Sequence, residues 1–179
     1  TDWNGLMIGA LARGAKVLRD ASYAEAAARA ADFILGSMRT PEGRLLHRYR
    51  DGEAGITGHL DDYAFLVSGL IELYEATFDT RYLEQALVLN GEMLDRFSDK
   101  GQGGLFFTPA DGEALIIRKK EAYDGAVPSG NAVAMLNLLK LARITGKPDL
   151  ESQAASIGRA FAGQIRQMPS GYTQWLTSA

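Results

Sequence analysis

The chain has 179 residues, of which 46% are hydrophobic and 23% charged, with 19 basic residues, 22 acidic residues and no cysteine. This composition is typical of a globular protein that buries a core, and it excludes disordered and collagen-like chains, disulfides and thiol catalysis. The basic residues are scattered and no run of about 18 apolar residues occurs, so we expect neither nucleic-acid binding nor a membrane span.

Three segments of the sequence share one pattern at offsets of 59 and then 68 positions. The matching positions include Trp3-Asn4, Asp62-Tyr63 and Gly130-Asn131, then Leu11, Leu70 and Leu138, then Tyr23, Tyr82 and Leu150. A repeat of this kind predicts three copies of one supersecondary unit stacked side by side.

Each repeat begins with a segment that is apolar on nearly all sides, at residues 6–18, 65–73 and 133–141. Helices with this pattern are buried, so we expect three inner helices. A segment with one apolar stripe follows each, starting at Tyr23, Tyr82 and Asp149, which predicts three outer helices.

Local signals mark several helix ends. Ser22 and Glu25 have the spacing of a capping box, and Ser129 is a suitable N-cap residue. Gly146 and Pro148 separate the fifth predicted helix from the sixth.

Two connections between repeats have strand-like runs on either side of an Asp-Gly pair. The first extends from Gly43 to Glu53 and the second from Gly104 to Glu113. An Asp-Gly pair between such runs is a hairpin signal, so we expect two small two-stranded ribbons at one rim of the helical stack.

The inner helices all point in one direction, so their N-terminal ends should gather on one face. The expected catalytic residues there are Asp62, Asp124 and His59, and the expected substrate-binding residues are Trp3, Asn4, Asp61, Tyr63, Ser129 and Asn131. Helix N-termini suit anionic or hydroxyl-rich ligands, and aromatic rings beside carboxylates and amides suit a sugar. Paired carboxylates are also what a glycosidase needs.

Structural roles are the alternative for several of these residues. Asp61 and Ser129 are good N-caps, and Asp124 before Gly125 suits an Asx-turn. Asp62 and Asn131 are expected inside their helices, where neither caps well, so we favour a binding site for these two.

The two histidines are interpreted differently from each other. His59, just before an inner helix, is a possible general acid or base, whereas His47 is expected at the surface of a strand. Because the two have no ligand-like spacing in sequence, we expect no metal and no cofactor.

Four motifs occur in the same order as in a known family: WNGLM at 3–7, LDDYAFL at 60–66, YEATFD at 74–79 and YDGAVPSGN at 123–131. Together they resemble the YyaL family of thioredoxin-like, spermatogenesis-associated proteins, over essentially the whole chain. The resemblance implies an all-α fold, with residues 1–179 forming three helical hairpins of the C-terminal half of an (α/α)6 toroid. Such toroids are similar to six-hairpin glycosidases and N-acylglucosamine 2-epimerases.

The resemblance also implies partners for this chain, namely the remaining toroid hairpins and a thioredoxin-like domain in a longer protein. We expect a carbohydrate-active or carbohydrate-binding domain with a small sugar-like ligand, glycosidase- or epimerase-like in type. The alternative is a non-catalytic module that binds a ligand or a protein. We expect the protein to be cytoplasmic, although the lack of cysteine leaves the compartment open.

Overall fold

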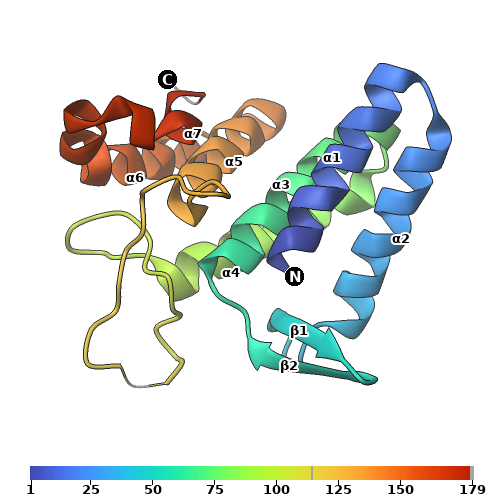
Figure 1. Ribbon diagram of the computed structural model, residues 1–179, viewed down its shortest axis with the longest axis horizontal. Helices are drawn as coiled ribbons and strands as arrows, with labels where there is room; N and C mark the ends of the chain where they lie inside the picture. The colour runs from blue at the N-terminus through green and yellow to red at the C-terminus, as the bar shows by residue number, and fades with distance from the viewer. Residues whose placement is uncertain (114, 178–179) are drawn as a thin grey trace. The chain divides into compact units, whose positions relative to one another are not determined.

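The computed structural model describes residues 1–113 and 115–177, and most of the described part is helical (Figure 1). The helices are α1 (Asp2–Leu18), α2 (Ala21–Ser37), α3 (Leu60–Thr77), α4 (Thr80–Phe97), α5 (Gly130–Thr145), α6 (Pro148–Gln167), η1 (Pro169–Gly171) and α7 (Thr173–Leu176), and the strands are β1 (Leu46–Arg50) and β2 (Glu53–Thr57). This order confirms the predicted series of three helical hairpins. The chain forms two compact units, Thr1–Asn90 and Gly91–Ala179.

In the first unit α3 is the central helix, and α1 packs along it (Figure 1). Nearly every side chain of α3 from Leu60 to Leu73 is buried, which confirms the predicted inner helix. The two helices approach closely because both carry glycine at the contact. A Cβ atom on Gly5 would lie 2.5 Å from the backbone carbonyl carbon of Phe65, and one on Gly69 would lie 2.6 Å from the Gly5 carbonyl oxygen.

Helix α1 differs from its prediction as a helix buried on all sides. Its buried residues are Gly5, Ile8 and Ala12. Four large apolar side chains of α1 are exposed, namely Trp3, Met7, Val17 and Leu18. Within the first unit α2 and α3 cover one face of α1, so the other face stays open.

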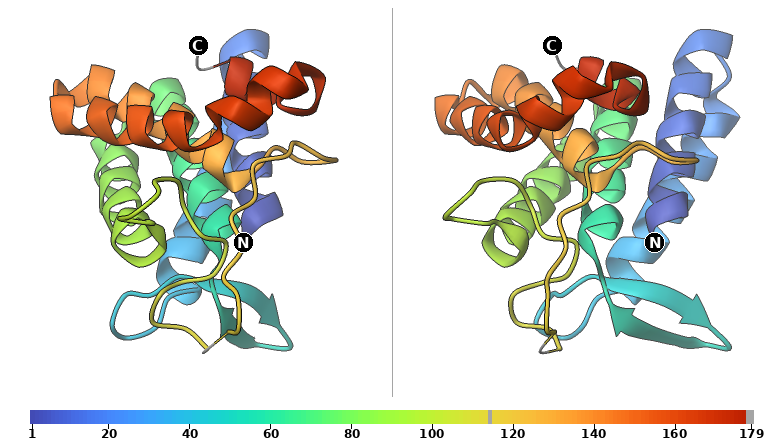
Figure 2. Two further views of the ribbon diagram at one scale, coloured as in Figure 1. Left: turned by 90° about the vertical axis from the view of Figure 1, so that its left-hand side faces the viewer. Right: turned by 60° about the vertical axis from the view of Figure 1, so that its left-hand side comes forward.

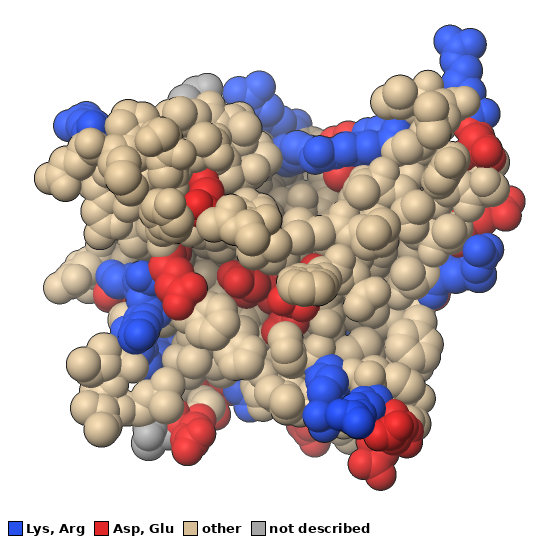
Figure 3. Space-filling view, viewed as in Figure 1, with Lys and Arg blue, Asp and Glu red and all other residues tan. Residues whose placement is uncertain are grey.

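The first predicted ribbon is confirmed. Strands β1 and β2 pair antiparallel, with Arg50 opposite Glu53 and a two-residue turn at Asp51-Gly52. Both turn residues have positive φ, 53° and 86°, as a tight hairpin turn of the primed type requires. Figure 3 shows basic and acidic side chains next to each other over this hairpin, on the face in view.

The second predicted ribbon is wrong for the described residues 98–113 and 115–128, where no strand ladder forms. This connection has one isolated bridge, between Ser98 and Leu105, and side chains fix it instead. Lys120 Nζ donates to Asp99 Oδ2 at 2.8 Å and to the Gly103 carbonyl at 3.0 Å. The position of residue 114 lies outside the described residues.

In the second unit α5 and α6 lie side by side, as the views in Figure 2 also show. The chain then turns through η1 into α7, two elements that the sequence pattern did not predict. Trp175 of α7 is buried, its ring centroid lies 5.2 Å from that of Phe161, and its Nε1 donates to the Ala122 carbonyl at 2.8 Å. The helix α7 is therefore tied to both α6 and the connection before α5.

Most of the predicted helix ends are confirmed. Ser129 Oγ accepts a hydrogen bond from the Ala132 amide, Gly146 ends α5 with φ of 70°, and Pro148 opens α6. The capping box of Ser22 is wrong, because α2 begins two residues earlier than it predicts, at Ala21, and the Asp20 carboxylate accepts from the Ser22 amide at 2.9 Å.

None of the helices within the described ranges combines the length and the apolar character that crossing a bilayer requires.

Candidate functional site

Asp62 is the centre of a polar cluster at the start of α3. Its side chain is only 1% exposed, yet it carries several hydrogen bonds. Oδ1 accepts from the Asp2 amide at 3.0 Å and Oδ2 accepts from the His59 amide at 2.8 Å. The expectation that Asp62 does not cap is therefore wrong, since its carboxylate closes the first turn of α3 and ties down the start of α1.

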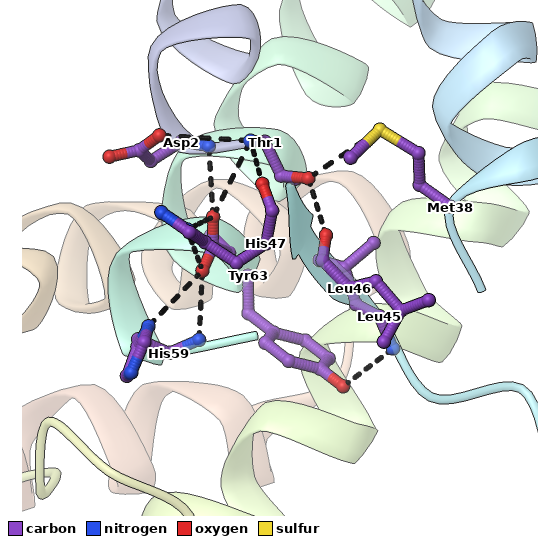
Figure 4. Close-up of polar contacts among 9 residues, drawn as sticks. Thr1, Asp2, Met38, Leu45, Leu46, His47, His59 and Tyr63 are labelled. Atoms are coloured by element: carbon purple, nitrogen blue, oxygen red, sulfur yellow. Dashed lines mark hydrogen bonds and ion pairs between the residues drawn. The ribbon is translucent and has the colours of Figure 1, made fainter. Parts of the chain in front are cut away.

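Two imidazoles flank this carboxylate (Figure 4). His47 of β1 has its Nδ1 at 3.0 Å from both oxygens of Asp62. His59, the N-cap residue of α3, has its Nδ1 at 3.8 Å from Asp62 Oδ2, and the two rings meet edge to face with centroids 5.5 Å apart. The cluster of His47, His59 and Asp62 is called the His-Asp cluster below.

His47 keeps part of the surface exposure expected for it, but its strand also folds back against the start of α1, so that its imidazole reaches Asp62. The Thr1 hydroxyl donates to the Leu46 carbonyl at 2.6 Å, and the Thr1 amino group donates to the His47 carbonyl at 2.7 Å (Figure 4). His47 and His59 are separated by 12 positions in sequence, so only the path of the hairpin shows that they meet. The absence of ligand-like spacing did not exclude a shared site.

The hydrogen bonds set the charge of the cluster. Burial alone would raise the pKa of Asp62, but hydrogen bonds from His59 and His47 outweigh it and lower that pKa below its ordinary value. The contact with Asp62 raises the pKa of His59, against the opposing effect of burial. Asp62 is thus an anion at neutral pH and does not fit the role of a protonated general acid.

Three accessible residues lie at the same ends of α1 and α3 as the His-Asp cluster. Trp3 is 73% exposed, Asn4 is exposed and Asp61 is partly exposed. All three lie in the first turn of α1 or α3, the two helices whose starts Asp62 joins. Of the expected site residues, the structure brings His59 and Asp62 into contact and adds His47, while Trp3, Asn4 and Asp61 lie in the same first turns of α1 and α3.

Tyr63 does not fit the stacking role that the sequence suggested. Its ring is 1% exposed, and its hydroxyl accepts a hydrogen bond from the Leu45 amide at 3.1 Å. The ring lies in the core of the first unit, so no ligand can lie against it.

Asn131, in the second unit, also has a structural environment, which overturns its expected contact with a ligand. It is fully buried, its Oδ1 accepts from the Leu105 amide at 2.8 Å, and its Nδ2 donates to the carbonyls of Leu105 and Glu121 at 2.9 Å each. These bonds fasten the connection that precedes α5.

Ser129 and Asp124 complete the same loop. Ser129 is buried and its side chain is engaged as the N-cap of α5, which contradicts the ligand contact expected for it. Asp124 accepts from the Ser129 amide at 2.9 Å and from the Gln174 amide at 2.8 Å. Its carboxylate therefore joins the loop to α7, in place of the Asx-turn with Gly125 that the sequence offered as the alternative.

Comparison with known proteins agrees with the predicted resemblance, although no family model matches the chain. In an alignment 177 positions long that covers 93% of this chain, the chain is 36% identical to human spermatogenesis-associated protein 20. The chain is a relative of spermatogenesis-associated protein 20. It spans 22% of the length of that protein, so it corresponds to one part of it.

Solved structures confirm the fold class. A glycoside hydrolase family 76 α-mannanase of Bacteroides thetaiotaomicron matches with a TM-score of 0.73 and 21% identity, over 91% of this chain and 44% of that one. The cellobiose 2-epimerase of Bacillus thermoamylovorans matches with a TM-score of 0.72 and 16% identity, over 88% of this chain and 42% of the epimerase. This relative of spermatogenesis-associated protein 20 thus has the (α/α) toroid architecture of six-hairpin glycosidases.

Proposed function

We propose that this chain is the C-terminal half of an (α/α)6 toroid that binds a small sugar-like ligand, as a carbohydrate-active or carbohydrate-binding domain. The fold is shared with a mannanase and a sugar epimerase, which supports a carbohydrate ligand by analogy. The observation that carries the proposal is the His-Asp cluster at the end where α1 and α3 begin, tied to a first turn of α1 that also carries the exposed Trp3.

Each group at this end has a use for a polyhydroxylated ring. The indole of Trp3 offers an apolar face for the C–H side of a sugar. The amide of Asn4, the carboxylate of Asp61 and the partly exposed imidazoles offer donors and acceptors for hydroxyl groups.

If the domain catalyses a reaction of the glycosidase or epimerase type, the solvent exposure and hydrogen bonds of each side chain decide the role that we assign to it. His59 is partly exposed and is assigned the contact with the ligand. Asp62 is buried with both oxygens engaged, so it is a positioning residue that orients the two imidazoles. Asp124 is assigned no reacting role, because two backbone amides occupy its oxygens.

The alternative, a module that recognises a ligand or a thioredoxin-like domain without transforming it, is favoured by one observation. Both oxygens of the buried Asp62 carboxylate accept hydrogen bonds from the protein itself, as in a structural network. Binding of a sugar without turnover would support this alternative.

The test is a calorimetric screen of neutral sugars and sugar phosphates against the protein and two variants. Trp3→Ala should weaken sugar binding at least about tenfold, equivalent to about 1.4 kcal/mol. Phe78→Ala is the matched control, because Phe78 is 78% exposed but lies at the C-terminal end of α3. Absence of sugar binding, or equal weakening by both variants, would contradict the proposal.

A further inference from the structure

The His-Asp cluster has the composition of a metal-binding site. It contains both histidines of the chain and a buried carboxylate, contributed by β1, the N-cap of α3 and the first turn of α3. One ligand-type atom from each of the three residues lies within 4.8 Å of the other two.

We propose that His47, His59 and Asp62 bind a divalent transition-metal ion of the Zn²⁺, Co²⁺ or Fe²⁺ class. Two imidazoles and one carboxylate are a recurring ligand set for such ions. The inference goes beyond the proposed sugar binding and does not depend on it.

The distances between the ligand atoms support one shared ion. Ligand atoms around an ion with bonds of about 2.1 Å lie about 3.0 to 3.5 Å apart. His47 Nδ1 is 3.0 Å from both oxygens of Asp62, and His59 Nδ1 is 3.8 Å from Oδ2. Ligand atoms of all three residues lie within 4.8 Å of one another, so an inward turn of the His59 side chain is needed to complete the set.

The carboxylate is held in place by groups that are not ligands. The amides of Asp2 and His59 each donate to one oxygen of Asp62. A carboxylate has about four lone-pair directions, so an oxygen fixed in this way still has one for an ion. Such outer hydrogen bonds orient the ligands in established metal sites.

The surrounding charges favour a cation. Besides Asp62, the carboxylates of Asp61 and Asp2 act on His59. The amino group of Thr1, 3.7 Å from Asp62 Oδ1, opposes a cation, but the three carboxylates outnumber it. The imidazole nitrogens select transition metals over Mg²⁺ and Ca²⁺, which prefer oxygen ligands.

Three protein ligands leave at least one coordination position for water or a further ligand. This is the arrangement of sites where an ion acts on a bound molecule, whereas structural zinc sites are closed by four protein ligands. The partial exposure of both imidazoles gives a path to the ion.

The competing explanation is a metal-free network in which His47 and His59 bond only to Asp62. Titration of the chelator-treated, tag-free protein with Zn²⁺ distinguishes the two. Because the chain has two histidines, its histidine ring NMR spectrum contains two sets of signals. Both should shift and saturate at one equivalent of Zn²⁺, while Ca²⁺ and Mg²⁺ should leave them unchanged.

Variants locate the ion. His47→Gln, His59→Gln and Asp62→Asn should each weaken Zn²⁺ binding at least about tenfold, because each removes one of three ligands. Asp51→Asn is the matched control: it removes an exposed carboxylate from the turn of the same hairpin, outside the cluster, and it should keep Zn²⁺ binding within about threefold of the unsubstituted protein.

Several outcomes would overturn the proposal: histidine signals that do not move with Zn²⁺, or an affinity that is equal in His47→Gln and the unsubstituted protein. Thermal unfolding of each variant checks the fold, and should Asp62→Asn fail to fold, His47→Gln and His47→Ala carry the test. A protein that binds sugar but no Zn²⁺ refutes this inference alone, whereas Zn²⁺ binding without sugar binding refutes only the proposed function.

Discussion

Tyr63 and Asn131 occupy matching positions of the repeat, and each holds the backbone of a buried leucine. The Leu45 amide donates to the Tyr63 hydroxyl at 3.1 Å, and the Leu105 amide donates to Asn131 Oδ1 at 2.8 Å. The two leucines lie in the connections that precede α3 and α5. This repeat position therefore fastens a connection to the helix that follows it, and two different polar side chains perform that role.

Replacement of Asn131 should destabilise the protein. Asn131→Ala removes three hydrogen bonds of a fully buried side chain and leaves the Leu105 amide without a partner. We expect the free energy of unfolding to fall by about 2 to 4 kcal/mol in urea titrations. Asn4→Ala is the control, because Asn4 is the exposed residue at the matching repeat position and its replacement should change stability by less than about 0.5 kcal/mol. Equal stabilities of the two variants would exclude this role of Asn131.

Tyr63→Phe should have a smaller effect in the same direction. The variant keeps the ring in the core but leaves the buried Leu45 amide without its acceptor. A loss of about 1 kcal/mol in the free energy of unfolding is expected. Tyr74→Phe on the same helix is the control, since Tyr74 is only partly buried. If Tyr63→Phe lowers the free energy of unfolding no more than Tyr74→Phe does, the Tyr63 hydroxyl does not contribute to stability.

The sequence predicted the helical repeat well because its signals are local. Apolar periodicity, the N-cap at Ser129 and the stop at Gly146 depend on residues within a few positions of each other, and the structure has all three. The first hairpin was predicted for the same reason, since Asp51-Gly52 specifies its own turn.

The polar site was only partly predictable, because it depends on contacts between distant segments. The residues around His47 have the pattern of a strand. Nothing near His47 in sequence shows that this strand folds back onto the Asp62 carboxylate. Asn131 has the polar character of a site residue, but its partners Leu105 and Glu121 are 26 and 10 positions away. Burial and hydrogen-bond partners, which decide between a ligand contact and a structural tie, are set by tertiary structure.

The close contact of α1 and α3 gives a prediction about glycine. Gly5→Ala places a methyl group 2.5 Å from the backbone of Phe65, so the helices must separate. We expect a loss of about 1 to 3 kcal/mol in the free energy of unfolding, measured by chemical denaturation.

Gly36→Ala in α2 is the matched control for this change. A Cβ atom there meets nothing within 4 Å, so the helix propensity of alanine should stabilise the protein by about 0.5 to 1 kcal/mol. Destabilisation by both variants would show that loss of glycine flexibility, and not the helix contact, causes the effect of Gly5→Ala.

Asp99 should respond to pH in a defined window. The hydrogen bond from Lys120, followed by those from the amides of Gln102 and Gly101, lowers the pKa of Asp99 from 3.8 to about 2. Because the pKa is lower in the folded protein, the stabilising effect is complete above pH 3.8 and is lost as the pH falls through about 2. Carboxyl-carbon NMR titration of Asp99 measures this directly, and the Gly101 amide, which donates to Asp99, should lose its exchange protection relative to an unfolded chain at the same pH in the same range.

Two lysine variants identify the cause of that shift. Lys120→Met removes the largest contribution, so the pKa of Asp99 should rise toward its ordinary value and the Gly101 amide should lose its exchange protection at a higher pH than before. Lys119→Met removes the same charge from the adjacent exposed position and should leave the titration of Asp99 nearly unchanged. If both variants shift the titration of Asp99 equally, the positive charge of the surroundings, and not the bond from Lys120, lowers the pKa of Asp99. If only Lys120→Met does, the direct bond to Asp99 is what fixes the connection that replaces the second ribbon.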